Sequence, residues 1–567
     1  MSTISIENKI DSFFNNSKSS VFDGLSYSSD SLFIFSKKIK KKLIVVESNN
    51  EGKRIYKELK VLGSHNNNSE IIFIPGTEEM PYDMVDSDKF LSSSKNLNLI
   101  KLLKSTSDNI TVITTIKNLR KKIIPKDVLL SETIFFKENE NLNINTIRNN
   151  LVSIGYVNSP QTNFCGEYTI RGSIIDIFPG GYLYPIRIDL DDVKVDSIKY
   201  FNTDTQITFG EKISEKIYIV PMNNVITKEN NITNFRKKYR EIFEGNPNES
   251  EIYSGISDNI IPQGINNYFP LFYNNIDTII NYFQNIEYVI LFNSTHLKLK
   301  EHSGKINEKF EDLKKNGENI LEPNFLFLEE RFINENISQK NIINVYKDKI
   351  LDKNSYNFNI SAIPDISIKP YLDKPIEDLR RHIEKQSCTI LFCDDQKKVT
   401  QFKDIFHDHD ISYKLINSLD EIYTNKNNFF IISGYLGKSF KINDIQISFI
   451  NSYDIIKEKI KQTSRKKNSK STFFIDQLKN LEIGSPVVHE IHGVGRYNGL
   501  QSLDTGGLNN EYLTILYEDN DKLYVPVASL HLVNKYNTVE DETAPLHKLG
   551  GFSWSTAKKK ERKKHMI

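Results

Sequence analysis

The segment at 434–439 comes nearest to a phosphate-binding loop, because it reads Gly-Tyr-Leu-Gly-Lys-Ser. Such a loop needs glycines whose backbone N–H groups wrap the phosphates, a lysine for the terminal phosphate and a hydroxyl for Mg²⁺. The Gly-Lys-Ser end is present, but the glycine that should open the motif falls on Ile432. We therefore interpret the segment as a turn that follows a strand at 429–433.

Other residues that could do chemistry stand without partners in the sequence. The His-Asp-His tripeptide at 407–409 has the i, i+2 spacing of metal ligands on a strand, but no third ligand is close. The acid pairs at 191–192 and 394–395 also lack a neighbouring histidine or third acid. The Gly-x-Gly at 493–495 does not open a helix, and no Gly-x-Ser-x-Gly elbow is present. We predict a polar loop at 407–409, solvated acids, and no catalytic, cofactor-binding or metal-binding residue.

Length and composition indicate a multidomain globular protein. The chain of 567 residues suffices for about three to five domains, and 38% hydrophobic with 26% charged residues is typical of packed folds. The net charge is +1, so acidic partners would bind local patches rather than an overall basic field. The three cysteines are too few for a disulfide framework and suit a reducing compartment. Because no signal-type start or run of about 18 apolar residues occurs, we predict a cytoplasmic protein.

The order of strand and helix patterns predicts a multidomain α/β and α+β fold. Buried-type strands at 42–47, 70–74 and 109–114, with a helix at 51–62, favour a parallel sheet. Later patterns are strands at 167–170, 173–178, 185–190, 195–201, 288–292, 389–393 and 429–433, and a charged helix near 236–243. The predicted segments are an α/β domain at 20–118, a β-rich domain at 119–215, the second part of the α/β module at 216–330, a further α/β domain at 340–455, a basic linker at 456–477, a small antiparallel β-barrel at 478–540 and the start of a helix at 546–567.

The predicted barrel carries the most specific sequence signal. Its short strands at 486–489, 512–517 and 522–527 alternate with Gly, Asn and Asp turns. The string His-Gly-Val-Gly-Arg-Tyr at 492–497, and Leu-His-Lys-Leu-Gly-Gly at 546–551, closely resemble the Mfd family of bacterial transcription-repair coupling factors. In that family the matching parts are an RNA-polymerase-interacting domain with a CarD-like barrel and the helix that follows it. The resemblance implies that this module binds the polymerase β subunit through Leu503 and Leu500.

A second resemblance covers the predicted β-rich domain. The string from Gly166 to Pro179 reads GEYTIRGSIIDIFP, and Pro-Ile-Arg-Ile-Asp follows at 185–189. It resembles the domain that transcription-repair coupling factors share with the excision-repair subunit UvrB, whose surface docks UvrA. The resemblance implies that Arg171 and Arg187 contact UvrA, and the planar fork of arginine suits carboxylates. One departure is that the family usually has Phe-Phe where this chain has Leu-Asp at 190–191.

The resemblance spans about residues 20 to 560 and is weakest at 330–455. In UvrB the first α/β domain holds a phosphate loop, whereas the equivalent stretch here, at 24–30, reads GLSYSSD. The family continues beyond the basic helix start into translocase domains that would hold ATP, Mg²⁺ and double-stranded DNA. We therefore expect a truncated coupling factor that has no motor and no cofactor of its own. Possible DNA phosphate contacts are Lys558, Lys559, Lys560 and Arg562.

The leading hypothesis is a transcription-repair coupling factor that binds RNA polymerase stalled at DNA lesions and recruits UvrA for nucleotide-excision repair. One alternative is an ATP-dependent DNA-unwinding subunit of the UvrB kind, which the missing phosphate loop disfavours. A second is a CarD-type transcription regulator that binds RNA polymerase. ATP hydrolysis would support the first alternative, and absence of UvrA binding would support the second.

Overall fold

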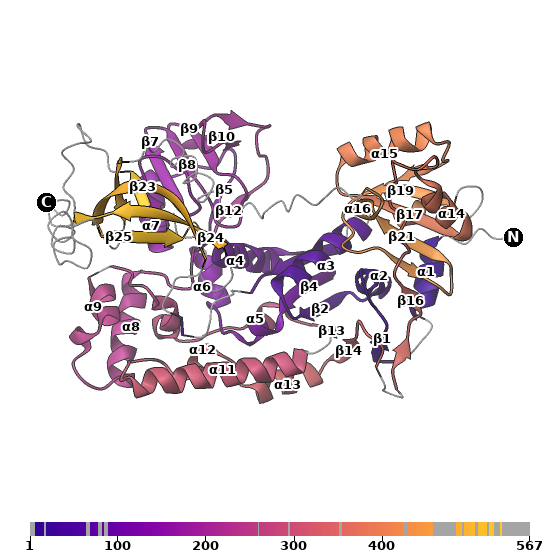
Figure 1. Cartoon of the computed structure of the whole chain (residues 1–567). Helices are drawn as coiled ribbons and strands as arrows, with labels where there is room; N and C mark the ends of the chain where they lie inside the picture. The colour runs from indigo at the N-terminus through magenta and orange to yellow at the C-terminus, as the bar shows by residue number, and fades with distance from the viewer. Residues whose placement is uncertain are drawn as a thin grey trace. The chain divides into compact units, whose positions relative to one another are not determined.

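The computed structural model describes residues 6–15, 19–63, 69–76, 82–83, 89–258, 260–292, 295–350, 354–422, 428–456, 484–489, 493–504, 509–518, 521–526 and 533–535. The chain divides into two compact units, residues 1–456 and 457–567 (Figure 1). Mixed sheets and helices confirm the predicted multidomain α/β class. Among the described residues, no helix has both the length and the apolar character needed to cross a bilayer.

The first unit begins with a seven-stranded parallel sheet of order β15-β1-β14-β13-β2-β4-β3. Its strands are β1 (Val21–Asp23), β2 (Lys41–Val46), β3 (Ser69–Ile74), β4 (Asn109–Thr115), β13 (Tyr288–Phe292), β14 (Asn341–Val345) and β15 (Tyr356–Asn357). β2 is buried from Lys42 to Val46, as expected of a parallel strand covered on both faces. The predicted parallel sheet is thus confirmed, and it takes in strands from beyond residue 340.

A six-stranded sheet of order β11-β10-β9-β8-β7-β6 follows. Its strands are β6 (Val157–Asn158), β7 (Glu167–Arg171), β8 (Ile174–Ile177), β9 (Ile186–Asp191), β10 (Lys194–Phe201) and β11 (Thr208–Phe209). β7 to β11 pair antiparallel and form the predicted meander, with a register shift between Val195 and Ser197. β5 (Ile134–Phe136) and β12 (Ile217–Ile219) form a separate two-stranded pair.

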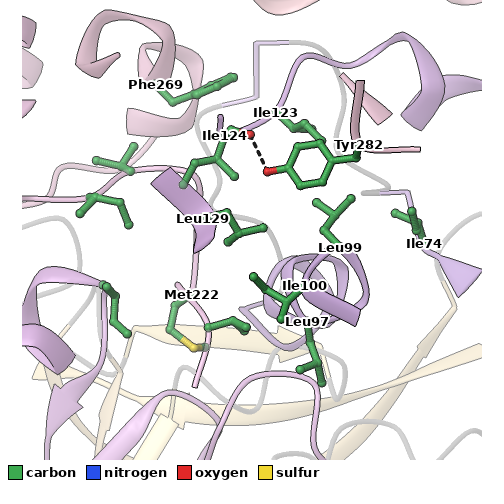
Figure 2. Close-up of a cluster of buried hydrophobic side chains, with 14 of the residues drawn as sticks. Ile74, Leu97, Leu99, Ile100, Ile123, Ile124, Leu129, Met222, Phe269 and Tyr282 are labelled. Atoms are coloured by element: carbon green, nitrogen blue, oxygen red, sulfur yellow. Dashed lines mark hydrogen bonds between the residues drawn. The ribbon is translucent and has the colours of Figure 1, made fainter. Parts of the chain in front are cut away.

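One continuous hydrophobic core joins both sheets and the helices between them. Figure 2 shows part of it, with side chains from β3, α4 (Lys89–Lys104), α6 (Lys126–Glu132) and later segments. The hydroxyl of Tyr282 lies inside this core and donates to the carbonyl of Ile124 at 2.8 Å. Because a buried phenol needs a partner, this bond satisfies the one polar atom that Tyr282 brings into the core.

A second six-stranded sheet has the order β16-β20-β21-β17-β19-β18. Its strands are β16 (Ile360–Ser361), β17 (Cys388–Cys393), β18 (Lys414–Ile416), β19 (Phe429–Ser433), β20 (Phe440–Ile442) and β21 (Ile447–Asn451). β18, β19, β17 and β21 are parallel, and β20 and β16 extend the sheet antiparallel. A cluster of its own, centred on Leu391, Phe402 and Ile450, covers one face.

The remaining helices cover the sheets of the first unit. They are α1 (Ile6–Asn15), α2 (Ser29–Ser36), α3 (Asn49–Leu62), α5 (Ile116–Arg120), α7 (Ile144–Ser153), α8 (Glu229–Ile242), α9 (Glu251–Ser257), α10 (Ile279–Tyr282), α11 (Thr295–Lys315), α12 (Pro323–Leu326), α13 (Glu330–Ser338), α14 (Glu377–Lys385), α15 (Gln396–Asp408), α16 (Ser452–Ile455) and the short turns η1 (Pro247–Glu249), η2 (Ile265–Asn267), η3 (Phe269–Phe272) and η4 (Leu419–Glu421). α3 starts on a side-chain cap from Ser48 and α15 on one from Asp395.

The second unit contains a five-stranded antiparallel sheet of order β25-β24-β23-β22-β26. Its strands are β22 (Pro486–His489), β23 (Gly493–Asp504), β24 (Asn509–Leu516), β25 (Lys522–Pro526) and β26 (Val533–Lys535). Val487, Leu513, Ile515, Tyr517 and Val525 form its buried core. Gly495 is required where β23 passes β24, since a Cβ there would lie 2.5 Å from Ile515 Cγ2. The antiparallel strands are confirmed, while closure into a barrel stays a prediction.

Candidate functional sites

The predicted arginines Arg171 and Arg187 meet on one carboxylate, that of Asp176. Arg187 Nε lies 2.7 Å from Asp176 Oδ1, and its Nη2 lies 2.9 Å from Oδ2. Arg171 Nη2 donates to the same Oδ2 at 3.0 Å. The Asp176 side chain is 0% exposed, Arg187 is 18% exposed and Arg171 is 54% exposed. The structure therefore brings both residues into one ion-pair cluster around a buried acid.

Strand register explains this cluster. Asp176 of β8 lies directly opposite Arg187 of β9, and Arg171 of β7 lies opposite Ile174, two residues before the acid. Side chains alternate along a strand, so Ile175 and Ile177 enter the core while Asp176 points to the other face. The Arg187 guanidinium also lies over the Phe201 ring, 5.0 Å from its centroid.

Hydrogen bonding to Asp176 also favours the charged form of Arg187. It raises the pKa of Arg187 above its ordinary value, despite partial burial, which lowers it. Asp189 and Asp191 lie on the same face of β9 as Arg187, whereas Leu190 is buried in the core. The departure from the family pattern thus places an exposed carboxylate at the end of β9, on the face that carries Arg187, and leaves the apolar core intact.

The predicted polymerase contacts lie in the second unit. Leu500 and Leu503 belong to β23, where they pair with Leu513 and Asn510 of β24. Their side chains lie outside the described residues, so the structure places their backbone only. The possible phosphate contacts Lys558, Lys559, Lys560 and Arg562 also lie outside the described residues.

The stretch at 24–30, which the resemblance aligns with the phosphate loop of UvrB, leads into a cluster of internal charges. The loop at 24–30 follows β1 and leads into α2, whose N-terminus would face a phosphate. Instead, the Asp30 carboxylate accepts from Ser31 N at 2.7 Å, and Arg54 bridges Asp30 and Glu58. The side chains of Asp30 and Glu58 are 0% and 1% exposed, and that of Arg54 is 16% exposed. Burial, and then Asp30, raise the pKa of Glu58 against the opposing effect of Arg54.

The glycine-containing turn at 434–439 closes the same region. Gly437 N donates to Glu58 Oε1 at 2.8 Å, and Lys438 N donates to Ser28 Oγ at 2.8 Å. A Cβ on Gly434 would lie 2.4 Å from Val61 Cγ1, so only glycine fits against α3 there. The turn predicted after β19 is confirmed, and its backbone amides bind protein side chains.

The other candidate residues are dispersed in the structure. His407 and Asp408 lie in the last turn of α15 with side chains 89% and 76% exposed, so the predicted loop is wrong at these two residues. Among the described residues no three His, Cys, Asp or Glu side chains are placed to hold a metal ion. Cys388 and Cys393 are buried in β17, and burial raises the pKa of each thiol to about 12.

Comparison with known proteins gives two domain matches. The family described as UvrB interaction domain matches residues 134–224, and this range contains Arg171, Asp176 and Arg187. The family described as CarD-like/TRCF RID domain matches residues 481–537, and this range contains Leu500 and Leu503.

The chain is also similar to curated proteins named transcription-repair-coupling factor. That of Haemophilus influenzae is 30% identical over 502 residues, which is 87% of this chain and 43% of the relative. Those of Escherichia coli and Bacillus subtilis are 29% and 26% identical over 86% and 79% of this chain, or 42% and 39% of their own lengths. The resemblance inferred from the sequence is therefore confirmed, and the chain spans less than half the length of these relatives.

Proposed function

We propose that this relative of the transcription-repair-coupling factors joins two protein machines, RNA polymerase and the excision-repair protein UvrA. One observation carries the proposal: a UvrB interaction domain match and a CarD-like/TRCF RID domain match occur in the same chain, at 134–224 and 481–537. A CarD-type regulator would need only the second module. A shared chain would hold repair proteins close to a polymerase stalled at a lesion, because tethering raises their effective concentration.

The polymerase surface is assigned to the second unit. We expect its sheet to close into the predicted barrel and to bind the polymerase β subunit by strand addition, in which exposed backbone pairs with the partner. Leu503 and Leu500 of β23 would supply side-chain specificity.

This assignment is tested by Leu503→Arg, with Asp521→Arg in the turn before β25 as the control. We expect Leu503→Arg to abolish co-precipitation of RNA polymerase and to leave the far-UV circular dichroism unchanged. Asp521 is exposed, and Asp521→Arg adds positive charge as Leu503→Arg does, but this control should still bind RNA polymerase. Polymerase binding by Leu503→Arg at the wild-type level would refute the assignment.

The UvrA surface is assigned to the arginine face of the six-stranded sheet. Arg171 is half exposed and belongs to a cluster with two positive charges on one buried acid, so it can attract a carboxylate of the partner. UvrA should be retained on the immobilised chain without ATP, and Arg171→Gln should weaken this binding. No retention of UvrA by the wild-type chain would overturn this part of the proposal.

We further propose that this chain does not turn over nucleotide. Support comes from the first turn of α2, where the carboxylate of Asp30 accepts from Ser31 N and pairs with Arg54, which also pairs with Glu58. ATP hydrolysis measured with double-stranded DNA should equal the buffer background. Stimulated turnover would favour the DNA-unwinding alternative. The basic residues Lys558, Lys559, Lys560 and Arg562 would add at most weak, salt-dependent contacts to DNA.

A further inference from the structure

Arg171 and Arg187 differ in what they still offer to a partner. An arginine side chain has five N–H donors on three nitrogens. Arg187 uses Nε and Nη2 on Asp176, and its Nη1 donates to the carbonyl of Gln206 at 3.2 Å. All three of its nitrogens therefore have acceptors within the domain, and the side chain is mostly buried.

Arg171 has the opposite character. Among the described residues its side chain makes one hydrogen bond, through Nη2 to Asp176 Oδ2, and 54% of the side chain is exposed. Neither its Nε nor its Nη1 has an acceptor among the described residues, so either nitrogen can donate to an external carboxylate. The shared acid holds Nη2 of the guanidinium, and more than half of the side chain stays exposed.

The charge balance assigns a role to Asp176. The Asp176 carboxylate and the two guanidinium groups together carry a net charge of +1, with Arg171 as the exposed member, and Asp189 on the same face adds a negative charge that acts on Arg187. Without Asp176, two like charges would lie side by side and repel, and Arg171 would lose its anchor. Holding a long side chain in place before binding removes part of the entropy cost of association.

We infer that Asp176 is a positioning residue that presents Arg171 to an acidic side chain of the docked partner, while Arg187 acts through Asp176. This inference rests on the proposed UvrA surface and deepens it. It changes the expectation drawn from the sequence, in which both arginines contact UvrA. In this arrangement Arg171 contacts the partner, whereas the guanidinium of Arg187 already binds an internal acid, Asp176.

A double-mutant cycle tests the inference with purified UvrA as the probe. The variants are Arg171→Gln, Asp176→Asn and the double variant, and the readout is the dissociation constant for UvrA. We expect each single change to weaken binding about tenfold, the effect of losing one charge-assisted hydrogen bond. The double variant should bind no more than about twofold more weakly than Asp176→Asn, because Arg171 is already misplaced there.

A purely structural role for Asp176 predicts a different result, since independent losses multiply. Additive effects, or unchanged binding by Asp176→Asn, would therefore overturn the inference. If Asp176→Asn fails to fold, Arg187→Lys alone and combined with Arg171→Gln gives an equivalent cycle. Lysine keeps the charge but loses the fork, so weaker binding with the same non-additivity is expected.

The matched control is Arg148→Gln on α7, an exposed arginine of the same domain whose helix packs through Ile147 and Leu151 into the core. It should bind UvrA like the wild type. If the wild-type chain itself does not bind UvrA, the proposed function fails. If it binds and Arg171→Gln weakens it while the cycle is additive, only the role of Asp176 fails.

Discussion

Replacing Arg54 by methionine tests whether the phosphate position is held closed by a paired charge cluster. Methionine keeps most of the side-chain volume but removes the guanidinium that lies 2.5 Å from Asp30 and 2.7 Å from Glu58. Both carboxylates are at most 1% exposed, so water cannot replace the lost partner. Breaking a buried ion pair on one side costs about 3–5 kcal/mol.

The loss should fall toward the lower end of this range, about 3 kcal/mol, because other donors remain. Glu58 keeps its bond from Gly437 N, and Asp30 keeps its bond from Ser31 N. The control is Arg331→Met, because Arg331 pairs with Glu335 on the surface and is 86% exposed. A surface pair of this kind contributes little, so the control should unfold like the wild type.

The assay is urea unfolding followed by far-UV circular dichroism, at about pH 7.5 and about pH 5.5. In the wild type, burial and Asp30 already raise the pKa of Glu58 above 4.5, and Arg54 opposes them. Without Arg54 this folded-state pKa rises further, so the folded variant takes up a proton more readily than the unfolded chain. Its stability then increases as the pH falls through that pKa, and the deficit against the wild type should shrink at the lower pH.

Two results would refute this reasoning about the cluster. The first is a variant as stable as Arg331→Met, which would mean that Arg54 does not neutralise the buried acids. The second is a deficit of the same size at both pH values, which would mean that no buried carboxylate gains a proton when Arg54 is lost.

Three further predictions concern the docking face, the turn at 434–439 and the cysteines. Asp191→Phe should tighten UvrA binding about tenfold by adding an apolar contact on the face of β9 that carries Arg187. The control Asp196→Phe at the β-bulge should not, and equal binding by Asp191→Phe and the wild type would contradict this. Gly434→Ala should destabilise the first unit by about 1–3 kcal/mol in urea unfolding, since its Cβ would lie 2.4 Å from Val61 Cγ1. An unchanged midpoint of unfolding would show that α3 can move away. At neutral pH a thiol reagent should label Cys165, which is partly exposed, before Cys388 and Cys393, whose buried thiols have pKa values raised to about 12; simultaneous labelling of all three would contradict it.

The strands of the six-stranded sheet were predictable because their side chains alternate. In β9 the apolar residues Ile186, Ile188 and Leu190 are all buried, and this alternation alone assigns the opposite face to Arg187. The start of α8 was not predictable in the same way. The sequence favours a helix near 236–243, but α8 begins at Glu229, where Lys228 makes no side-chain cap bond, so the capping residue that usually marks a helix start is missing.

The pairing of strands that are far apart in the sequence was the main feature of the fold that could not be predicted. β14 and β15 are short strands whose pairing with β1 depends on residues more than three hundred positions away, which local periodicity does not report. The role of Asp176 left one trace, since an acid stands inside the apolar run IIDI of β8. Asp30, Arg54 and Glu58 left none, because their contact is set by the packing of α2 against α3 and the 434–439 turn.

The two charge clusters of the first unit are built from the same kinds of side chain, arginines and carboxylates, but differ in their arrangement. At α2, one arginine is shared by two buried acids and lies 3.9 Å from a third, Glu51, and the 434–439 turn donates a backbone amide to the cluster. At β8, one buried acid is shared by two arginines, and the surplus positive charge remains exposed at Arg171. The ratio of acids to bases and the exposure of the surplus charge therefore distinguish a closed structural cluster from an open docking surface. By this criterion we propose that the seven-stranded sheet serves as a scaffold and that the sheet of β6 to β11 serves as a docking surface for a partner.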